Sequence, residues 1–365
     1  MRLRRLFLCA ALVTVACNHE QPFETPGNGS GDPFRPGSPV QLTYNPGRDL
    51  RPYWAPDGGA FFYAWERLGG PDFDRCIAEM PGSGGRNLRD ICNPDPASVD
   101  STDLFDVPSP SAEGRMLYIR GSSRPGAVAP DHSGIFIGPT ADPLSGSQVR
   151  SLPFTIPGLA TVASVSNVRW VGTNSLLVLA EAVDYPRACA SCKPDTVVTG
   201  LAIVEMDLVG RNEASFQTIP GTQGATSLDL APTRDTVYFT LAGDTRVFRL
   251  TFPNLQPSVV HDFGALGVPR DITVRGGRLV AVVGGRDIAG PLVSVDLANG
   301  TETPLNAGRP LWFRRPAFAP APATSRLVVE GYDLIITQFL PPGSTVFVTD
   351  TTVSTVSDLY LYSAP

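Results

Sequence analysis

Two cysteines stand close enough in the sequence to act together. Cys189 and Cys192 flank an alanine and a serine, the CxxC spacing that serves redox exchange, metal binding or a local disulfide. The segment lacks the strand-helix-strand setting of thioredoxin-like redox motifs, and Lys193 stands where haem attachment requires a histidine. A zinc site needs a second ligand pair, and His132 and His261 do not have that spacing. We therefore predict a structural disulfide, with redox exchange and metal binding as the alternatives.

Motifs for nucleophilic or metal-assisted catalysis are missing from the sequence. There is no Gly-x-Ser-x-Gly nucleophile turn, no His-Glu-x-x-His pair and no glycine-rich phosphate loop. Beyond residue 39 the only histidines are His132, expected in a surface turn, and His261, expected at the surface end of a strand. The sequence predicts a binding protein and not an enzyme, with no cofactor and no metal site.

The N-terminal residues have the pattern of a bacterial export signal. Three arginines lie among the first five residues, and residues 6–15 form an apolar segment too short to span a bilayer as a helix. The segment ends in Val13-Thr-Val-Ala-Cys17, which resembles the lipobox of bacterial lipoproteins, with threonine in place of the usual leucine or valine. The resemblance implies that residues 1–16 are a signal peptide and that the Cys17 thiol is acylated. The alternative is ordinary signal cleavage that leaves Cys17 free.

Removal of the signal peptide and acylation of Cys17 would leave four cysteines. An even number in an exported chain indicates disulfides, because the compartment is oxidising. The simplest pairing joins Cys76 to Cys92 and Cys189 to Cys192, each as a local bridge.

Composition indicates the fold class and excludes one class of partner. The 36 glycines and 36 prolines interrupt short runs of valine, isoleucine, leucine, phenylalanine and tyrosine, a pattern typical of strands and turns. The formal net charge of −6 disfavours nucleic-acid binding. Residues 17–39 are rich in glycine, proline, serine and asparagine, which predicts a flexible tether that connects the lipid to a folded body.

A strand-turn-strand unit recurs from Val40 onward. Its best copy spans residues 51–65, where Pro56-Asp57-Gly58 turns the chain between two strands. Further copies start near residues 105, 167, 227, 271 and 315, at intervals of about 44 to 62 residues. The shortest intervals match one four-stranded propeller blade, and the longer ones leave room for the loops that hold the cysteines. The repeats predict an all-β propeller of six blades over residues 40–365.

One copy of the unit matches a known repeat family closely. Pro52-Tyr-Trp-Ala-Pro-Asp-Gly58 resembles the PD40 family of WD40-like repeats, found in TolB and in the propellers of prolyl oligopeptidase-like enzymes. Phe318-Ala-Pro320 and Leu230-Ala-Pro232 keep part of the string. The resemblance implies a six-bladed β-propeller of four-stranded blades, whose innermost strands line an axial channel. We do not expect a Tol role, because TolB's separate N-terminal α/β domain has no counterpart in this sequence.

The two ends of the repeat region predict how the ring closes. Val40-Gln-Leu-Thr43 has no preceding blade, and the chain ends on Asp358-Leu-Tyr-Leu-Tyr362. We expect this N-terminal strand to complete the last blade, which removes the open edge that would otherwise template aggregation. Residues 333–353 then form an insertion in the last blade.

The inner strands, aligned on their turns, bring polar residues to two equivalent positions. Strand alternation puts both positions on one face, which we expect to line the channel. The candidate binding residues are Arg51, Tyr53, Asn167, Arg169, Asp229, Asp271 and Arg315. The arginines suit a carboxylate or an anionic peptide, because guanidinium binds such groups bidentately. The alternative is that these charges pair with one another and with channel water. Trp54, Trp170 and Phe318 have the opposite parity and are expected in the core between blades.

The sequence thus predicts a monomeric, lipid-anchored propeller of the bacterial cell envelope that binds an unidentified protein or peptide partner. Cys17 is expected to supply the only membrane contact. Asn18 is not the aspartate that retains some lipoproteins at the inner membrane, which favours the outer membrane, facing the periplasm or the cell surface. The alternative is a propeller enzyme, or a small-molecule or glycan-binding module, that uses the axial channel.

Overall fold

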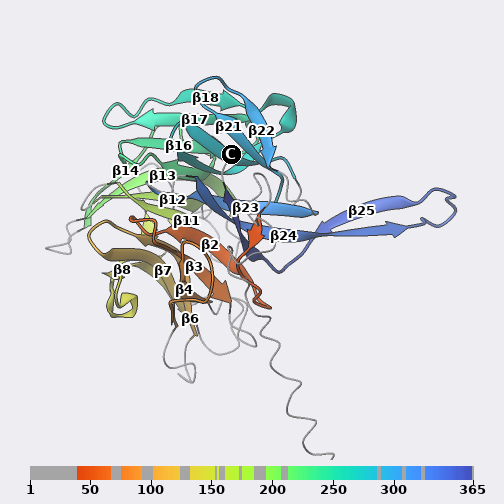
Figure 1. Cartoon of the computed structure of the whole chain (residues 1–365). Helices are drawn as coiled ribbons and strands as arrows, with labels where there is room; N and C mark the ends of the chain where they lie inside the picture. Colours follow the sequence, from red (N-terminus) through yellow and green to blue (C-terminus); the bar gives the residue numbers. More distant parts are fainter. Residues whose placement is uncertain are drawn as a thin grey trace, which may run out of the picture.

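The computed structural model describes most of the chain between Pro39 and Ser363 (Figure 1). The described segments are 39–66, 75–92, 102–123, 132–152, 154–155, 161–171, 175–184, 195–206, 213–285, 289–305, 310–321 and 325–363. The expected signal peptide, Cys17 and the tether lie outside them, as do Cys189 and Cys192. None of these segments contains a helix long and apolar enough to cross a membrane.

Antiparallel strands form six sheets in the described residues, and four of these sheets have four strands. The first sheet contains β2 (Asp49–Trp54), β3 (Ala60–Glu66), β4 (Arg75–Pro81) and β5 (Arg89–Ile91). The second contains β6 (Thr102–Pro110), β7 (Arg115–Ser123), β8 (His132–Pro139) and β9 (Ser147–Leu152). The other two contain β15 (Ala225–Leu230), β16 (Thr236–Leu241), β17 (Arg246–Thr251) and β18 (Ser258–Asp262), then β19 (Pro269–Arg275), β20 (Arg278–Val283), β21 (Leu292–Asp296) and β22 (Glu302–Leu305). Short 3-10 turns cover Pro143–Ser145 and Gly264–Leu266.

The remaining two sheets have five strands each. One contains β10 (Phe154–Thr155), β11 (Thr161–Trp170), β12 (Ser175–Asp184), β13 (Asp195–Met206) and β14 (Glu213–Thr218). The last contains β23 (Leu311–Phe318), β24 (Arg326–Phe339), β25 (Val348–Val353), β26 (Asp358–Ser363) and β1 (Val40–Gln41). The prediction of four strands per blade is wrong for the sheet of β11, because β10 pairs with the start of β11 as a fifth strand. In the last sheet, β1, β26, β24 and β23 are the four predicted strands, and β25 pairs with the extension of β24 inside the expected insertion.

One strand from each of the six sheets contributes to a central ring. Strands β2, β6, β11, β15, β19 and β23 contact one another in this order, and β23 in turn contacts β2. Each sheet continues outward from its inner strand by antiparallel pairing. This arrangement is a β-propeller, and the all-β propeller predicted from the sequence is confirmed.

The turn between β2 and β3 shows how the repeated sequence builds a blade. The Ala55 N–H donates to the Ala60 carbonyl and the Gly58 N–H donates to the Ala55 carbonyl, both at 2.9 Å. Gly58 has a φ of 69°, a conformation that costs glycine little because it has no Cβ. The Gly59 N–H donates to the Asp57 carboxylate at 2.9 Å. Asp57 therefore caps this turn.

The core lies between neighbouring sheets. Trp54, Trp170 and Phe318 are 5%, 3% and 3% exposed, and each belongs to a packed cluster formed by two adjacent sheets. The Trp54 indole N–H also donates to the Ala317 carbonyl at 2.9 Å, from the first sheet to the last. Their predicted place in the interblade core is confirmed.

The N-terminal strand closes the last sheet as predicted. β1 pairs antiparallel with β26, with Val40 opposite Leu361. The contact continues past the strand, where the Leu42 N–H donates to the Leu359 carbonyl at 2.7 Å and the Leu359 N–H donates to the Thr43 hydroxyl at 2.8 Å. Residues from both ends of the described chain therefore hold one sheet together.

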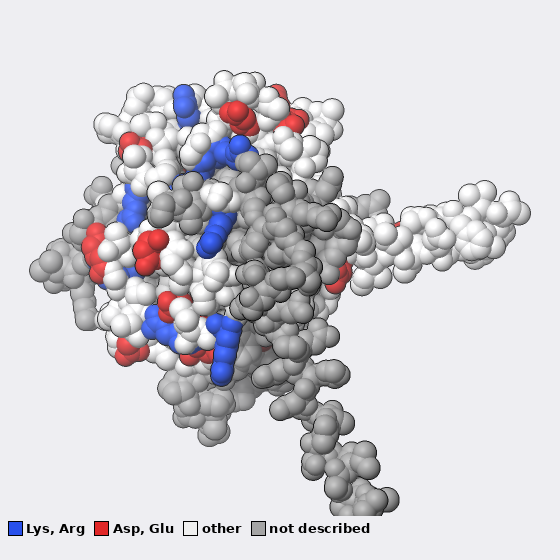
Figure 2. All heavy atoms as spheres, in the orientation of Figure 1, with Lys and Arg blue, Asp and Glu red and all other residues white. Residues whose placement is uncertain are grey.

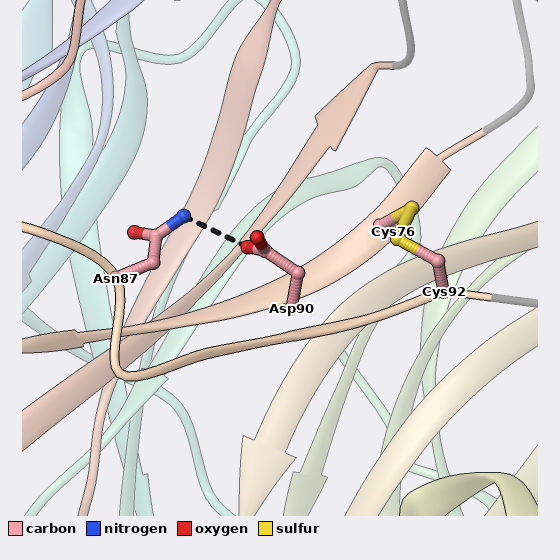
Figure 3. Close-up of a disulfide and its surroundings, with 4 residues drawn as sticks. All are labelled: Cys76, Asn87, Asp90 and Cys92. Carbon is pink, nitrogen blue, oxygen red and sulfur yellow. Dashed lines mark hydrogen bonds between the residues drawn. A yellow bond between two sulfur atoms is a disulfide. The ribbon is translucent and has the colours of Figure 1, made fainter.

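The predicted bridge between Cys76 and Cys92 is present (Figure 3). It joins the start of β4 to the residue after β5, across a sequence separation of 16 residues. Between the two cysteines, the Asn87 side-chain amide donates to the Asp90 carboxylate at 2.8 Å. The disulfide fixes the outer edge of the first sheet.

Candidate functional site

A pocket of about 400 Å³ lies on the ring of inner strands. Its lining comes mainly from β2, β11, β15, β19 and β23 and from the turns that follow them, and it includes Pro110 of β6 and Leu179 of β12. All seven candidates predicted from the sequence line this axial pocket: Arg51, Tyr53, Asn167, Arg169, Asp229, Asp271 and Arg315. Residues of the opposite parity, such as Trp54 and Trp170, line the pocket as well, so the lining alone does not show that one face of each strand forms the channel. The role of the seven candidates in binding remains a prediction.

Three further arginines line the axial pocket, and the sequence analysis missed them: Arg234, Arg275 and Arg314. Arg275 continues the period of two that begins with Asp271, so the same alternation would have found it. Arg314 was hidden by a β-bulge, since the register between β23 and β24 shifts just after it. Arg234 belongs to the turn after β15, where no strand periodicity applies.

Two arginines occupy equivalent bulges in neighbouring inner strands. Arg51 and Arg315 each precede a proline and have φ values of 53° and 44°, in the left-handed region that few residues other than glycine adopt. Each bulge turns a backbone N–H toward a neighbouring sheet. The Arg51 N–H donates to the Glu330 carboxylate, and the Arg315 N–H donates to the Asp271 carboxylate at 3.2 Å. The strained conformations therefore join the blades and aim two guanidinium groups at the pocket.

The two aspartates of the axial pocket are bonded to adjacent sheets. Asp229 accepts from the Thr273 hydroxyl and from the Val274 N–H, both at 2.9 Å. Asp271 accepts from the Arg315 N–H and, at 3.4 Å, from the Arg314 guanidinium. Both carboxylates thus link one blade to the next, as the alternative of internal charge pairing anticipated.

The arginines of the pocket outnumber its aspartates, and several of them are held in place by neighbouring side chains. Arg169 lies over the Tyr53 ring, with its guanidinium carbon 4.6 Å from the ring centroid, and donates to the Asn167 side chain. Arg315 bonds at 3.1 Å to Glu330, which is fully buried. For Arg275, the side-chain Nε has no hydrogen-bond partner among the described residues. Six arginines and two aspartates line the pocket.

This donor set is suited to an anion. Guanidinium groups present planar pairs of N–H donors that match carboxylates and phosphates. The excess positive charge is opposite in sign to the net charge of the chain, −6. Across the described part of the chain, no three His, Cys, Asp or Glu side chains gather in a way that could hold a metal ion.

His261 lies away from the axial pocket. His261 was expected at the surface, but its side chain is only 11% exposed and its Nε2 lies 2.8 Å from the Glu302 carboxylate of the next sheet. Its ring also meets Phe263 edge-on, with the centroids 4.7 Å apart. His261 therefore packs between blades. His132 was expected in a turn and instead begins strand β8, and its side chain lies outside the described part.

Comparison with known proteins identifies a shared fold. No protein-family model and no curated protein sequence matches this chain. Among solved structures, regucalcin from Agrobacterium tumefaciens, a calcium-binding protein, is 15% identical with a TM-score of 0.50, covering 81% of this chain and 85% of regucalcin. The Cps50 (Swd1) propeller domain of Myceliophteria thermophila is 11% identical with a TM-score of 0.50, covering 90% of this chain and all of that domain.

TolB is also among the similar structures. The protein from Acinetobacter baumannii is 13% identical with a TM-score of 0.47, covering 84% of this chain and 64% of TolB. The similar structures include a luciferin-regenerating enzyme as well, which is 13% identical with a TM-score of 0.49. A shared fold does not by itself identify a function. The class is a β-propeller, and its activity has to be argued from the axial pocket.

Proposed function

We propose that this protein is a binding scaffold of the bacterial cell envelope, whose axial pocket takes an acidic segment of a protein or peptide partner. The excess of arginine in the pocket carries the proposal. The two aspartates accept hydrogen bonds from the neighbouring sheet, while Arg169 and Arg275 line the pocket and have no carboxylate partner in the described part of the chain. Charge-assisted bonds to such arginines favour carboxylates over neutral groups.

We also infer six blades for the propeller and a lipid anchor at Cys17. The blade number is supported by the ring, since each of the six sheets supplies one inner strand to it. The anchor is supported by the lipobox-like sequence before Cys17. It would hold the propeller at a membrane of the envelope, with the outer membrane favoured.

Crosslinking from the pocket rim in native envelope tests the scaffold proposal. A photoreactive residue in place of Pro232, which lines the pocket and is exposed, should give a protein adduct. The same residue in place of Thr303, which is exposed on outer strand β22, is the control and should give none. The adduct should weaken when Arg169→Gln and Arg275→Gln are added. Absence of an adduct at Pro232, or equal adducts at both positions, would contradict a partner at the pocket.

A small acidic molecule is the second candidate ligand. The pocket volume of about 400 Å³ falls in the range of small-molecule sites, roughly 300–1,000 Å³. A propeller enzyme or a sugar-acid-binding module would use the same arginines. A sugar acid that raises the melting temperature, together with no protein adduct from Pro232, would favour this second function.

A further inference from the structure

The last sheet carries a hairpin that projects away from the propeller (Figure 1). We call residues 334–353 the arm. Strand β24 pairs with β23 only as far as Asp333, and beyond it Leu334–Phe339 pairs with β25 alone. At about 3.3 Å per residue, these six paired residues place the arm tip roughly 20 Å beyond the sheet.

The arm tip is apolar and exposed. Phe339, Leu340, Val346, Phe347 and Val348 are 50%, 48%, 68%, 65% and 43% exposed. The arm contains no lysine or arginine, and Figure 2 shows it almost entirely white. A soluble surface rarely presents several large apolar side chains together unless they contact a partner.

The apolar side chains of the tip lie on both faces of the hairpin. Phe339 and Val348 are directly paired and share one face. Leu340 and Phe347 are the next residues toward the tip, so alternation directs them to the other face. A groove on a partner protein covers one face of a hairpin and would leave the other in water. A lipid surface surrounds the tip and covers both.

Part of the backbone of the tip is satisfied within the tip itself. Pro341 and Pro342 have no N–H, and the Ser344 N–H donates to the Pro341 carbonyl at 3.0 Å. The Val346 N–H donates to the Ser344 hydroxyl at 3.0 Å. These internal bonds reduce the cost of moving the turn out of water, which is the main obstacle to inserting irregular backbone into lipid.

We propose that the arm tip inserts into the interfacial layer of a lipid membrane. Because the arm has no basic side chain, the surface that it fits is zwitterionic and not strongly anionic. The choice of lipid rests in part on the proposed envelope function.

β1 is the outermost strand of the sheet that carries the arm, so the chain leads from this sheet toward Cys17. Residues 17–39 could reach roughly 75 Å when extended, so a lipid at Cys17 and the arm tip can meet one membrane.

Flotation with phosphatidylcholine vesicles tests the arm without the anchor. The Cys17→Ser full-length protein should float with the vesicles, and adding Phe339→Ser and Phe347→Ser should reduce its partition coefficient by about tenfold or more. Leu88→Ser with Leu266→Ser is the matched control, since these side chains are 61% and 49% exposed away from the arm. The control should float like its parent. All variants should keep the parent's melting temperature, because the replaced side chains are exposed.

A reporter at the tip gives a second readout. Phe347→Trp in the Cys17→Ser protein should show an emission shift to shorter wavelength when vesicles are added, beyond any shift of the parent. No flotation of the parent, equal flotation of the arm variant, or no shift at Trp would overturn the proposal. A dimer that the serine substitutions dissolve, with no flotation, would assign the tip to a second copy and equally overturn it.

The anchor is tested separately by the mass of the mature wild-type protein. An unmodified Cys17 together with arm-dependent flotation would remove the proposed anchor and leave the arm proposal standing. An acylated Cys17 without arm-dependent flotation would support the anchor and overturn the arm proposal.

Discussion

Asp49 is an acidic residue buried where the first and last sheets meet. It is fully buried, and the Asn45 side-chain amide donates to its carboxylate at 2.8 Å. The pKa of Asp49 is raised to about 7, chiefly by burial and in smaller part by the carboxylates of Asp358 and Glu330, while hydrogen bonds with the Thr43 and Asn45 side chains act to lower it. The folded protein therefore holds a proton on Asp49 at pH values where the unfolded chain has lost it.

This proton makes stability depend on pH. Between about pH 4 and pH 7 the folded state binds more protons than the unfolded state, so the free energy of unfolding should fall as the pH rises through this window. The rise from 3.8 to about 7 corresponds to a change of about 4 kcal/mol at most. Asp49→Asn should flatten this dependence and be more stable than wild type at pH 8, measured by urea unfolding at several pH values.

Asp235→Asn is the matched control for Asp49. Asp235 is exposed, and hydrogen bonds from Thr233 and Thr236 lower its pKa, so its replacement should leave the slope between pH 4 and pH 7 unchanged. An Asp49→Asn protein with the slope of wild type would show that Asp49 does not hold the proton.

Among individual residues, strand alternation in the sequence predicted pocket-lining positions where the inner strands are regular. Arg169 was found because it lies two residues beyond Asn167 on a regular part of β11, whereas Tyr53 lines the pocket although the register of β2 shifts just before it. Arg314 was not found, because the bulge at Arg315 breaks the period of two, and a bulge depends on the hydrogen bond to Asp271 in a different blade. The fully buried Glu330 was missed for a similar reason, since its partners Arg51 and Arg315 come from two other strands.

Among the elements, the β4–β5 edge depends on the Cys76–Cys92 disulfide. A closed loop of this length removes enough freedom from the unfolded chain to stabilise the protein by about 3 kcal/mol. Cys76→Ala with Cys92→Ala should therefore lower the free energy of unfolding by about that amount, measured by urea unfolding. Equal unfolding midpoints for wild type and the Cys76 and Cys92 variant would contradict a stabilising role.

The elements also show where sequence patterns stop being informative. The insertion expected at residues 333–353 was placed correctly, and its two strands have sequences typical of β-strands. The sequence could not predict that β24 continues beyond the blade into a projecting arm. Phe339 and Phe347 are exposed because no other described element packs against them, and this is a property of the tertiary structure. The extra strand β10 has only two residues and leaves no periodic signal.

For the whole molecule, closure of the ring depends on a few residues at the start of the described chain. Leu42 is 3% exposed and packs in the cluster shared by the first and last sheets. A protein that begins after Thr43 loses β1 and Leu42 and exposes the edge of β26. It should unfold at a lower urea concentration and self-associate through that edge, measured by urea unfolding and by size-exclusion chromatography at several concentrations.

A protein that begins at Pro39 retains the closing strand and is the control for this truncation. It should remain monomeric and unfold like the full-length chain. If the two truncated proteins had the same unfolding midpoint and the same size, β1 would not close the propeller.

The central claim for the whole molecule is that its axial pocket binds acidic segments. Its most direct test is fluorescence anisotropy of a labelled glutamate-rich peptide, titrated with wild type, Arg169→Gln, Arg275→Gln and Arg249→Gln. Arg249 is exposed on β17, outside the pocket, so Arg249→Gln removes the same charge without changing the pocket. The account predicts binding that weakens with added salt, an affinity loss of about tenfold for each pocket variant and no loss for Arg249→Gln. No binding by wild type, or the same loss in all three variants, would contradict it.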